Sequence, residues 1–196
     1  GCDATGEALV VDNCDYPGGE PVVNITGGEF TSTNANPIGS YKKSDDPAQN
    51  DGPAEAVTGF VAGGSFSDSL DSKLLDTTLK YELKNVAVNP DAPYRYFAKL
   101  EDAVKEAEGY SDAEIKTTAA ANPGQSTTYT VTFRDKGNGT EYSLTVAEKE
   151  MISMPNVSRA GYTFQGWLSS ADGKLYQADA SVSISANTTF TAQWAY

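Results

Sequence analysis

Strict alternation of apolar and polar residues marks the last third of the chain. Threonines at 128, 130 and 132 alternate with Tyr129, Val131 and Phe133, which predicts a half-buried β-strand. A loop with two glycines follows at 135–139, and apolar residues then return at every second position of 142–146. The two alternating runs therefore predict a β-hairpin.

Aromatic residues dominate the rest of this region. Residues 161–167 read GYTFQGW, and residues 190–194 read FTAQW and form the expected last strand. Gly166 interrupts the period of two and predicts a β-bulge. A small domain needs a few large apolar groups to fill its core. We therefore expect Trp167 and Trp194 to be structural residues rather than a stacking platform for sugar rings.

Upstream, the pattern changes between a period of two and a period near 3.6. Residues 79–83 alternate like a strand. Residues 99–108, KLEDAVKEAE, place four apolar side chains on one helical face, and Gly109 follows as a stop. A helix this short is marginal alone and must dock on a sheet. The charged side chains of 99–108 are expected to form its solvated face.

Two upstream segments repeat one pattern. Residues 21–32 and 57–68 each contain an apolar strand, a pair of glycines and a phenylalanine two residues later, and the glycine pairs are 36 residues apart. A strand, a Gly-Gly turn and an inward phenylalanine suit one rung of a β-solenoid. Two ordinary turns of a β-sandwich would give the same pattern, so both architectures stay open.

Residues 129–195 resemble a Listeria–Bacteroides repeat, also called the internalin B-repeat. The resemblance rests on VTFRDKGNG at 131–139, Pro155, GYTFQGW at 161–167 and TAQW at 191–194. It implies a small β-grasp-like module of the kind found in bacterial cell-surface proteins, often in tandem. The upstream part is more loosely similar to exported bacterial proteins with GGTF-type rungs, through GGEF at 27–30, GGSF at 63–66 and YFAKLEDAV at 96–104.

These patterns together predict a mainly β protein with one short helix. The first domain, 1–120, is expected to be β-rich, either solenoid-like or a sandwich, with the helix near 99–108. Residues 121–128 are small and polar around a Pro-Gly pair and form the expected linker. Residues 127–196 form the expected β-grasp-like module.

Charge supports a boundary at this position. The net charge is −13, of which residues 1–125, with 21 acidic and nine basic side chains, carry −12. Nucleic acids and anionic membranes attract clustered lysine and arginine, so neither partner is expected. No apolar run approaches the roughly 20 residues that span a bilayer, so we expect no membrane insertion within this chain.

The absence of histidine argues against catalysis. The chain has no histidine, which removes the commonest general base and the commonest metal ligand. The carboxylates Asp45, Asp46 and Asp51 do not fit the spacing of a calcium loop, and we expect a solvated loop there. Carboxylate pairs arise by chance in a chain with 27 acids. We expect no enzyme, no cofactor and no metal.

The two cysteines, Cys2 and Cys14, are expected to have a structural role. Their number excludes a four-cysteine zinc site, and their spacing excludes a CxxC redox motif. A disulfide would suit an exported protein and would hold a terminal segment in place. Two free thiols, or a lipidated Cys2 at the start of a mature lipoprotein, are the alternatives.

Four tyrosines lie outside any clear alternation, and we treat them as candidate ligand-contact residues: Tyr41, Tyr94, Tyr96 and Tyr110. Aromatic side chains that are not needed in a core offer flat faces to a glycan or to a protein.

The sequence as a whole favours an exported bacterial cell-surface protein that acts in adhesion or as a spacer without catalysis. Its expected partner is an unidentified host or matrix protein or a glycan. Its expected location is extracellular or on the cell surface, with a cell-wall or lipid anchor outside this chain. The alternative is a carbohydrate-binding module of a larger glycan-processing protein.

Overall fold

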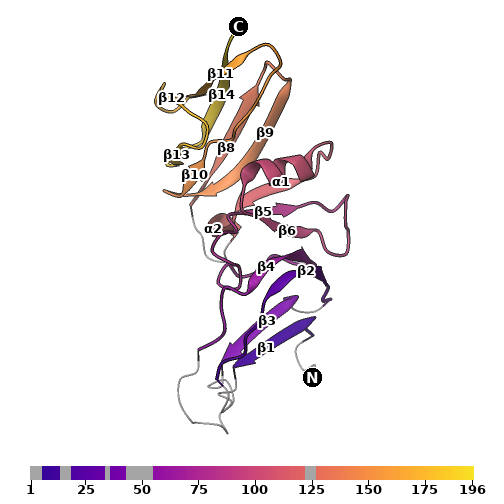
Figure 1. Cartoon of the computed structure of the whole chain (residues 1–196). Coiled ribbons are helices and arrows are strands. Elements are labelled where there is room, and N and C mark those ends of the chain that lie inside the picture. The colour runs from indigo at the N-terminus through magenta and orange to yellow at the C-terminus, as the bar shows by residue number, and fades with distance from the viewer. Residues whose placement is uncertain (1–5, 14–18, 34–35, 43–54, 122–126) are drawn as a thin grey trace. The chain divides into compact units, whose positions relative to one another are not determined.

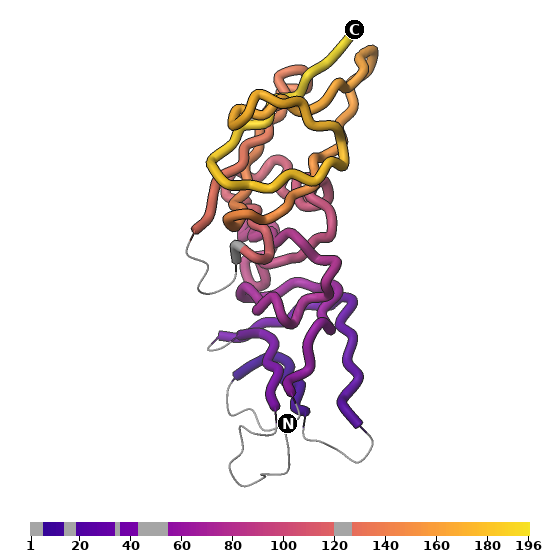
Figure 2. Tube along the Cα trace, turned by 90° about the vertical axis from the view of Figure 1, so that its left-hand side faces the viewer, coloured from indigo at the N-terminus to yellow at the C-terminus, as the bar shows by residue number. Residues whose placement is uncertain are grey.

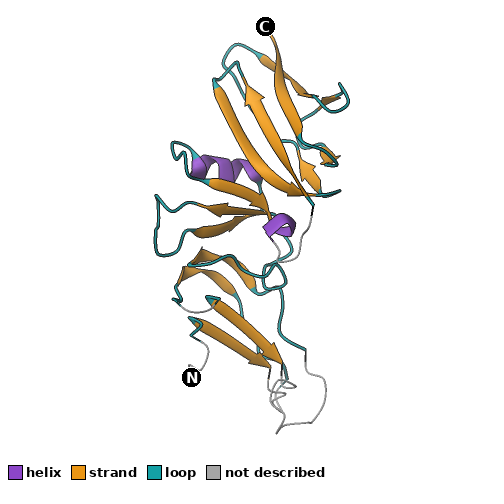
Figure 3. Ribbon diagram, turned by 180° about the vertical axis from the view of Figure 1, so that it is seen from behind, coloured by secondary structure: helices purple, strands orange, loops and turns teal. Residues whose placement is uncertain are grey.

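The computed structural model describes residues 6–13, 19–33, 36–42, 55–121 and 127–196, and the rest is drawn grey in Figures 1 and 2. Cys2, Cys14, the acidic loop at 43–54 and most of the expected linker lie outside the described residues. Strands are the commonest regular structure, at 46% of residues, and the only helix longer than one turn in the described ranges is α1 (Figure 3). The predicted fold class, mainly β with one short helix, is confirmed.

The chain folds into two compact units. Unit 1 contains residues 1–79, 83–96 and 110–113, and unit 2 contains residues 80–82, 97–109 and 114–196. The helical segment at 97–109 thus belongs to the same compact body as the C-terminal module. The predicted division of the sequence into a domain at 1–120 and a module at 127–196 stays a prediction.

Unit 1 is built on parallel strand pairs. Strand β1 (Leu9–Asn13) pairs in parallel with β3 (Ile38–Lys42), and β2 (Ile25–Phe30) pairs in parallel with β4 (Val61–Phe66). The β2–β4 register aligns the two sequence repeats, with Phe30 opposite Phe66. The two rings stack with centroids 5.5 Å apart. The repeat seen in the sequence is therefore a repeat of structure.

A further layer continues the same stack. Leu75 forms a parallel bridge with Val61, and the Val61 N–H donates to the Leu74 carbonyl at 2.9 Å. Parallel pairing of equivalent residues is the arrangement that solenoid rungs require. The assignment of unit 1 to a β-solenoid rather than a sandwich stays a prediction. Strand β6 (Tyr94–Phe97) pairs antiparallel to β4 through Tyr94 and Phe66, and β5 (Tyr81–Lys84) precedes it in the chain.

The glycine pairs allow the two rungs to approach closely. A β-carbon on Gly63 would lie 2.5 Å from the backbone oxygen of Thr26 on the neighbouring rung, and Gly64 has a φ of +121°. A side chain at position 63 would press on the backbone of Thr26, which cannot move aside as the end of a flexible side chain could.

Replacing Gly63 by alanine is expected to destabilise unit 1 by about 1–3 kcal/mol through this overpacking. Equilibrium urea denaturation measures the change. Gly59→Ala is a control for clash alone, because a β-carbon there meets nothing within 4 Å, although its φ of +70° adds backbone strain. An unchanged free energy of unfolding in Gly63→Ala would contradict the close approach of the rungs.

Unit 2 contains a mixed sheet with the order β12-β11-β14-β8-β9-β7. Its strands are β7 (Glu114–Thr117), β8 (Thr128–Asp135), β9 (Thr140–Ala147), β11 (Thr163–Ser169), β12 (Leu175–Tyr176) and β14 (Thr188–Ala195). β8 and β9 pair antiparallel from Thr128–Ala147 to Asp135–Thr140, which confirms the predicted hairpin. β14 returns parallel to β8 and antiparallel to β11. The first and last strands of the C-terminal module thus lie side by side in parallel, and its assignment as β-grasp-like stays a prediction.

Helix α1 (Leu100–Ala107) confirms the predicted helix. It buries Leu100 and Ala103, while Val104 and Ala107 are half-buried, so the predicted apolar face is the docked face. β7 then pairs in parallel with β9, through Ile115 and Leu144. A single helical turn, α2 (Thr118–Ala121), ends the segment. α1 and β7 are thereby part of the same packed body as the C-terminal strands.

The core of unit 2 is aromatic. Trp167 is completely buried, and its ring meets Phe133 edge-on at 5.0 Å. Phe133 also stacks on Phe190 at 5.3 Å. The Trp167 Nε1–H donates to the Pro155 carbonyl at 2.8 Å, so its one polar group is satisfied. The short strands β10 (Met151–Ser153) and β13 (Ser181–Ser183) pair with each other and add Ile152 and Val182 to the buried set.

The predicted bulge at Gly166 is confirmed. The β11–β14 register shifts between Phe164 and Gly166, and Gly166 has a φ of +130°. A β-carbon there would lie 2.8 Å from the Tyr176 carbonyl oxygen. Glycine thus allows both the positive φ and the close approach of β12. The bulge turns Trp167 into the core.

Candidate functional site

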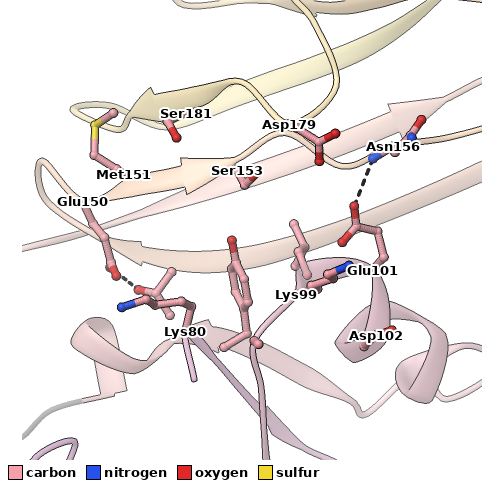
Figure 4. Close-up of a pocket in the computed structure, with 14 residues that line it drawn as sticks. Lys80, Lys99, Glu101, Asp102, Glu150, Met151, Ser153, Asn156, Asp179 and Ser181 are labelled. Atoms are coloured by element: carbon pink, nitrogen blue, oxygen red, sulfur yellow. Dashed lines mark hydrogen bonds between the residues drawn. The ribbon is translucent and has the colours of Figure 1, made fainter. Parts of the chain in front are cut away.

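A polar pocket in unit 2 gathers side chains that are distant in sequence (Figure 4). Its volume is 630 Å³. It is lined by residues from the start of β5, the start of α1, the end of β7, strand β10 and the segments that follow β10. The polar side chains among its lining residues are Lys80, Tyr81, Lys99, Glu101, Asp102, Thr117, Glu150, Ser153, Asn156, Asp179 and Ser181.

Tyr81 forms the buried part of this pocket. It is the first residue of β5, and its ring is buried. Burial is the main reason that its pKa lies above the usual value; nearby Glu101 and Glu150 raise it further, and a hydrogen bond with the Ser153 backbone opposes the shift. The phenol therefore stays neutral at physiological pH and serves as a hydrogen-bonding group, not as a base.

Glu150 also lines the pocket, at the turn into β10. Its carboxylate accepts a hydrogen bond from the Thr117 hydroxyl. Partial burial raises its pKa above the usual value, while the Thr117 and Ala147 hydrogen bonds and the charge of Lys80 oppose that rise. Removal from water thus outweighs the contacts that favour the charged form.

Glu150→Gln is expected to change how stability depends on pH. Because the folded state raises the pKa of Glu150, it holds this proton more tightly than the unfolded chain, and stability falls as pH rises above the ordinary value of 4.5 toward the raised value. The variant should lose this fall. Urea denaturation from below pH 4.5 to neutral pH measures it. The control is Glu148→Gln, an exposed neighbour. Parallel curves for Glu150→Gln and the wild type would contradict the expectation.

Glu101 ties α1 to the loop after β10. Its carboxylate accepts the Asn156 backbone N–H at 3.1 Å, the contact drawn dashed in Figure 4. Glu101 and Asp102 occupy the first turn of α1, where the positive end of the helix favours acidic side chains. With Glu150 and Asp179 the lining holds four carboxylates against two lysines. This excess of negative charge disfavours phosphorylated or other polyanionic ligands.

The four candidate ligand-contact tyrosines all belong to unit 1, and none lines the pocket. Tyr96 is only 7% exposed: its ring packs on Phe66, and its hydroxyl oxygen accepts the Leu70 N–H at 2.6 Å. Tyr96 is therefore a core residue of unit 1, not an aromatic side chain left outside the core. Tyr94 is half-buried against the same core, with the Lys84 ammonium 5.7 Å from its ring centre.

The remaining two tyrosines differ in exposure. Tyr41 is half-buried on β3, and its hydroxyl bonds to the Glu7 carboxylate. Tyr110 is 43% exposed. Ligand contact at Tyr41, Tyr94 and Tyr110 stays a prediction.

Asp135 is a structural centre that no pattern in the sequence indicates. This carboxylate is buried at the end of β8. It accepts the N–H groups of Gly137 and Asn138 at 3.0 and 3.2 Å, the Asn138 side-chain amide at 2.8 Å and the Trp194 Nε1–H at 2.9 Å. Asp135 thus organises the hairpin loop and binds the last strand to it. Trp194, the predicted structural residue, is half-buried in this contact.

A second cluster lies near the same loop. The Arg159 guanidinium lies 3.8 Å from the ring centre of Tyr162, and Tyr162 meets Tyr196 edge-on at 5.5 Å. The motif segments 131–139, 161–167 and 191–194 thus converge through hydrogen bonds and ring contacts.

A comparison with known protein families matches one segment of the chain. Residues 129–193 match the Listeria-Bacteroides repeat domain. The suspected resemblance is confirmed for these residues, about a third of the chain. No curated protein and no solved structure matches the chain.

The match to the repeat domain indicates the class of protein in which such a domain occurs. It occurs in bacterial surface and extracellular proteins and is not known as a catalytic domain. Within the described residues no helix is long and apolar enough to cross a membrane. In the same residues no cluster of three or more acidic or cysteine side chains is arranged to hold a metal ion.

Proposed function

We propose that this chain is a non-catalytic part of an exported bacterial surface protein and acts as a spacer or in adhesion. The observation that carries the proposal is that the motif residues of the repeat domain lie in its core or hold its last strand in place. Trp167, Phe133 and Phe190 build the core, and Trp194 closes the last strand onto Asp135. The motif is used to make the fold, which is what a spacer module needs.

The chemistry of unit 2 agrees with this role. The chain has no histidine. The pocket offers a neutral phenol, and two of its carboxylates accept hydrogen bonds from the protein itself: Glu150 from the Thr117 hydroxyl and Glu101 from the Asn156 backbone N–H. These contacts fasten α1 and β7 to the repeat domain, so the lining has a structural use without a substrate.

A whole-cell experiment tests the role. Antibodies against the purified chain are applied to intact and to permeabilised cells of the source bacterium, and adhesion of a strain lacking residues 1–196 is compared with that of its parent. The proposal predicts labelling of intact cells. Reduced adhesion of the deletion strain would support adhesion, and normal adhesion would support a spacer. Labelling only after permeabilisation would contradict both.

A carbohydrate-binding module is the second candidate, and two exposed aromatic residues favour it. Tyr110 is 43% exposed, and Tyr162 is 37% exposed with Arg159 against its ring. The Arg159 guanidinium lies over the Tyr162 ring at 3.8 Å from its centre, so stacking of a sugar there would use the ring surface that the guanidinium leaves uncovered. Isothermal titration with glycans would then show binding that Tyr110→Ala or Tyr162→Ala abolishes without loss of stability.

A further inference from the structure

The first and last strands of the repeat domain are neighbours in the sheet and run parallel. Thr188, Thr189, Phe190 and Thr191 of β14 lie opposite Val131, Thr132, Phe133 and Arg134 of β8. β8 begins at Thr128, and β14 ends at Ala195. In a parallel pair, the start of one strand and the end of the other lie at opposite ends of the pair. Tension between the two ends of the domain therefore slides β14 along β8.

This geometry decides how tension acts on the hydrogen bonds between β8 and β14. Hydrogen bonds of a parallel pair are evenly spaced along the strands, so sliding strains all of them together. Strands pulled apart from one end instead break their bonds one after another. The β8–β9 hairpin provides this second geometry in the same domain, because Thr128 lies directly opposite Ala147 at its open end.

We infer that the β8–β14 pair is a mechanical clamp that keeps the repeat domain folded when its two ends are pulled apart. The inference deepens the proposed spacer role and rests on it, since a spacer on a cell surface carries tension when its ends are held.

Packing reinforces the clamp on both sides. β14 is covered by β11 on its other edge, and β8 by β9. Phe133 and Phe190, opposite each other in the register, stack at 5.3 Å and are fully buried. Sliding of β14 therefore also disrupts the aromatic core.

A latch closes the loaded end. Trp194 lies two residues before the end of the described chain, and its Nε1–H bonds to the buried carboxylate of Asp135 at 2.9 Å. Tension applied at Tyr196 reaches this contact before it reaches the β8–β14 ladder. Hydrogen bonds to a carboxylate are among the stronger ones in proteins, so the latch delays the first movement of β14.

Optical tweezers on the full chain test the clamp. Handles are attached through cysteines at exposed positions, with Cys2 and Cys14 changed to serine. One pair, Thr128→Cys and Tyr196→Cys, loads the strands in shear, and the other, Thr128→Cys and Glu148→Cys, unzips the hairpin. Because four registered pairs are loaded together in shear, the unfolding force at one loading rate should be roughly two- to fourfold higher. Equal forces in the two directions would overturn the inference.

Two variants separate the clamp from general stability. Trp194→Phe removes the latch hydrogen bond and keeps a ring. Val182→Ala weakens the core on β13, away from the clamp. Trp194→Phe should lower the shear force and leave the unzipping force unchanged, whereas Val182→Ala should leave the shear force near that of the parent. If Val182→Ala lowers the shear force as much as Trp194→Phe does, the resistance comes from overall stability and the clamp is refuted.

The force measurement and the whole-cell experiment fail independently. Low shear force in a chain that labels intact cells would refute the clamp and leave the surface role standing. High shear force in a chain found only inside cells would refute the surface role and leave the clamp as a property of the fold.

Discussion

Trp167→Ala is expected to lower the free energy of unfolding of unit 2 by about 3–5 kcal/mol, the largest effect of any substitution considered. The indole is completely buried, packs against Phe133 and Phe164, and donates its one hydrogen bond to Pro155. The variant leaves a cavity in the core, and it leaves the Pro155 carbonyl without this donor. Guanidinium denaturation followed by circular dichroism measures the loss.

The neighbouring residue supplies the control. Leu168 follows Trp167 on the same strand but points outward and is 40% exposed. Leu168→Ala removes an aliphatic side chain without opening a cavity, so its effect should be within about 1 kcal/mol. Similar losses for the two variants, or an unchanged stability of Trp167→Ala, would show that the indole is not a core residue.

Asp135→Ala is expected to destabilise unit 2 by about 2–4 kcal/mol. The carboxylate accepts four hydrogen bonds from the hairpin loop and from Trp194, and all four donors lose their acceptor at once. Asp135→Asn keeps one acceptor oxygen and should recover part of the loss. Thermal and urea denaturation of the three proteins give the order wild type, Asp135→Asn, Asp135→Ala.

Asp172 provides a matched aspartate in a loop. It accepts the Lys174 N–H at 3.1 Å and the Tyr176 hydroxyl at 2.7 Å, but it is exposed. Water replaces those contacts when the carboxylate is removed, so Asp172→Ala should cost clearly less than Asp135→Ala. The account of Asp135 is contradicted if the two alanine variants lose equal stability.

Local features of the fold were predictable because short-range patterns encode them. The alternation at 128–133 and 142–146 gives the hairpin, because a period of two places one face of each strand in the core. Gly166 marks the bulge because it interrupts that period. The apolar face of 99–108 gives α1. Each of these signals lies within one element or between adjacent ones.

Long-range pairing was not predictable in the same way. The parallel β8–β14 pair joins residues more than 50 positions apart, and no local pattern specifies it. The pairing of β7 with β9 places 114–117 beside the repeat domain, although the composition changes near 125. The change in charge near residue 125 reflects mainly residues on the surface. The order of strands in the sheet depends instead on which strand edges are free to pair. The pocket combines segments from Lys80 to Ser181 and follows from the same long-range order.

Two residues show where sequence reasoning about single side chains fails. Tyr96 is buried because the Leu70 N–H satisfies its hydroxyl, a partner that the sequence does not reveal. Asp135 has the sequence context of an ordinary turn residue, yet the return of β14 covers it with Trp194. In both cases a contact distant in sequence decides whether a polar group is exposed or buried.

We propose that this chain is a non-catalytic surface module whose motif residues build its fold. The most direct test of this proposal is binding of the purified chain to an array of mucin and plant glycans and to matrix proteins. The array is read at low and at physiological salt, because a net charge of −13 attracts basic surfaces. We predict no salt-resistant glycan binding, and any retained signal should be to protein. A salt-resistant glycan signal that Tyr110→Ala or Tyr162→Ala abolishes without loss of stability would contradict the claim and identify a carbohydrate-binding module.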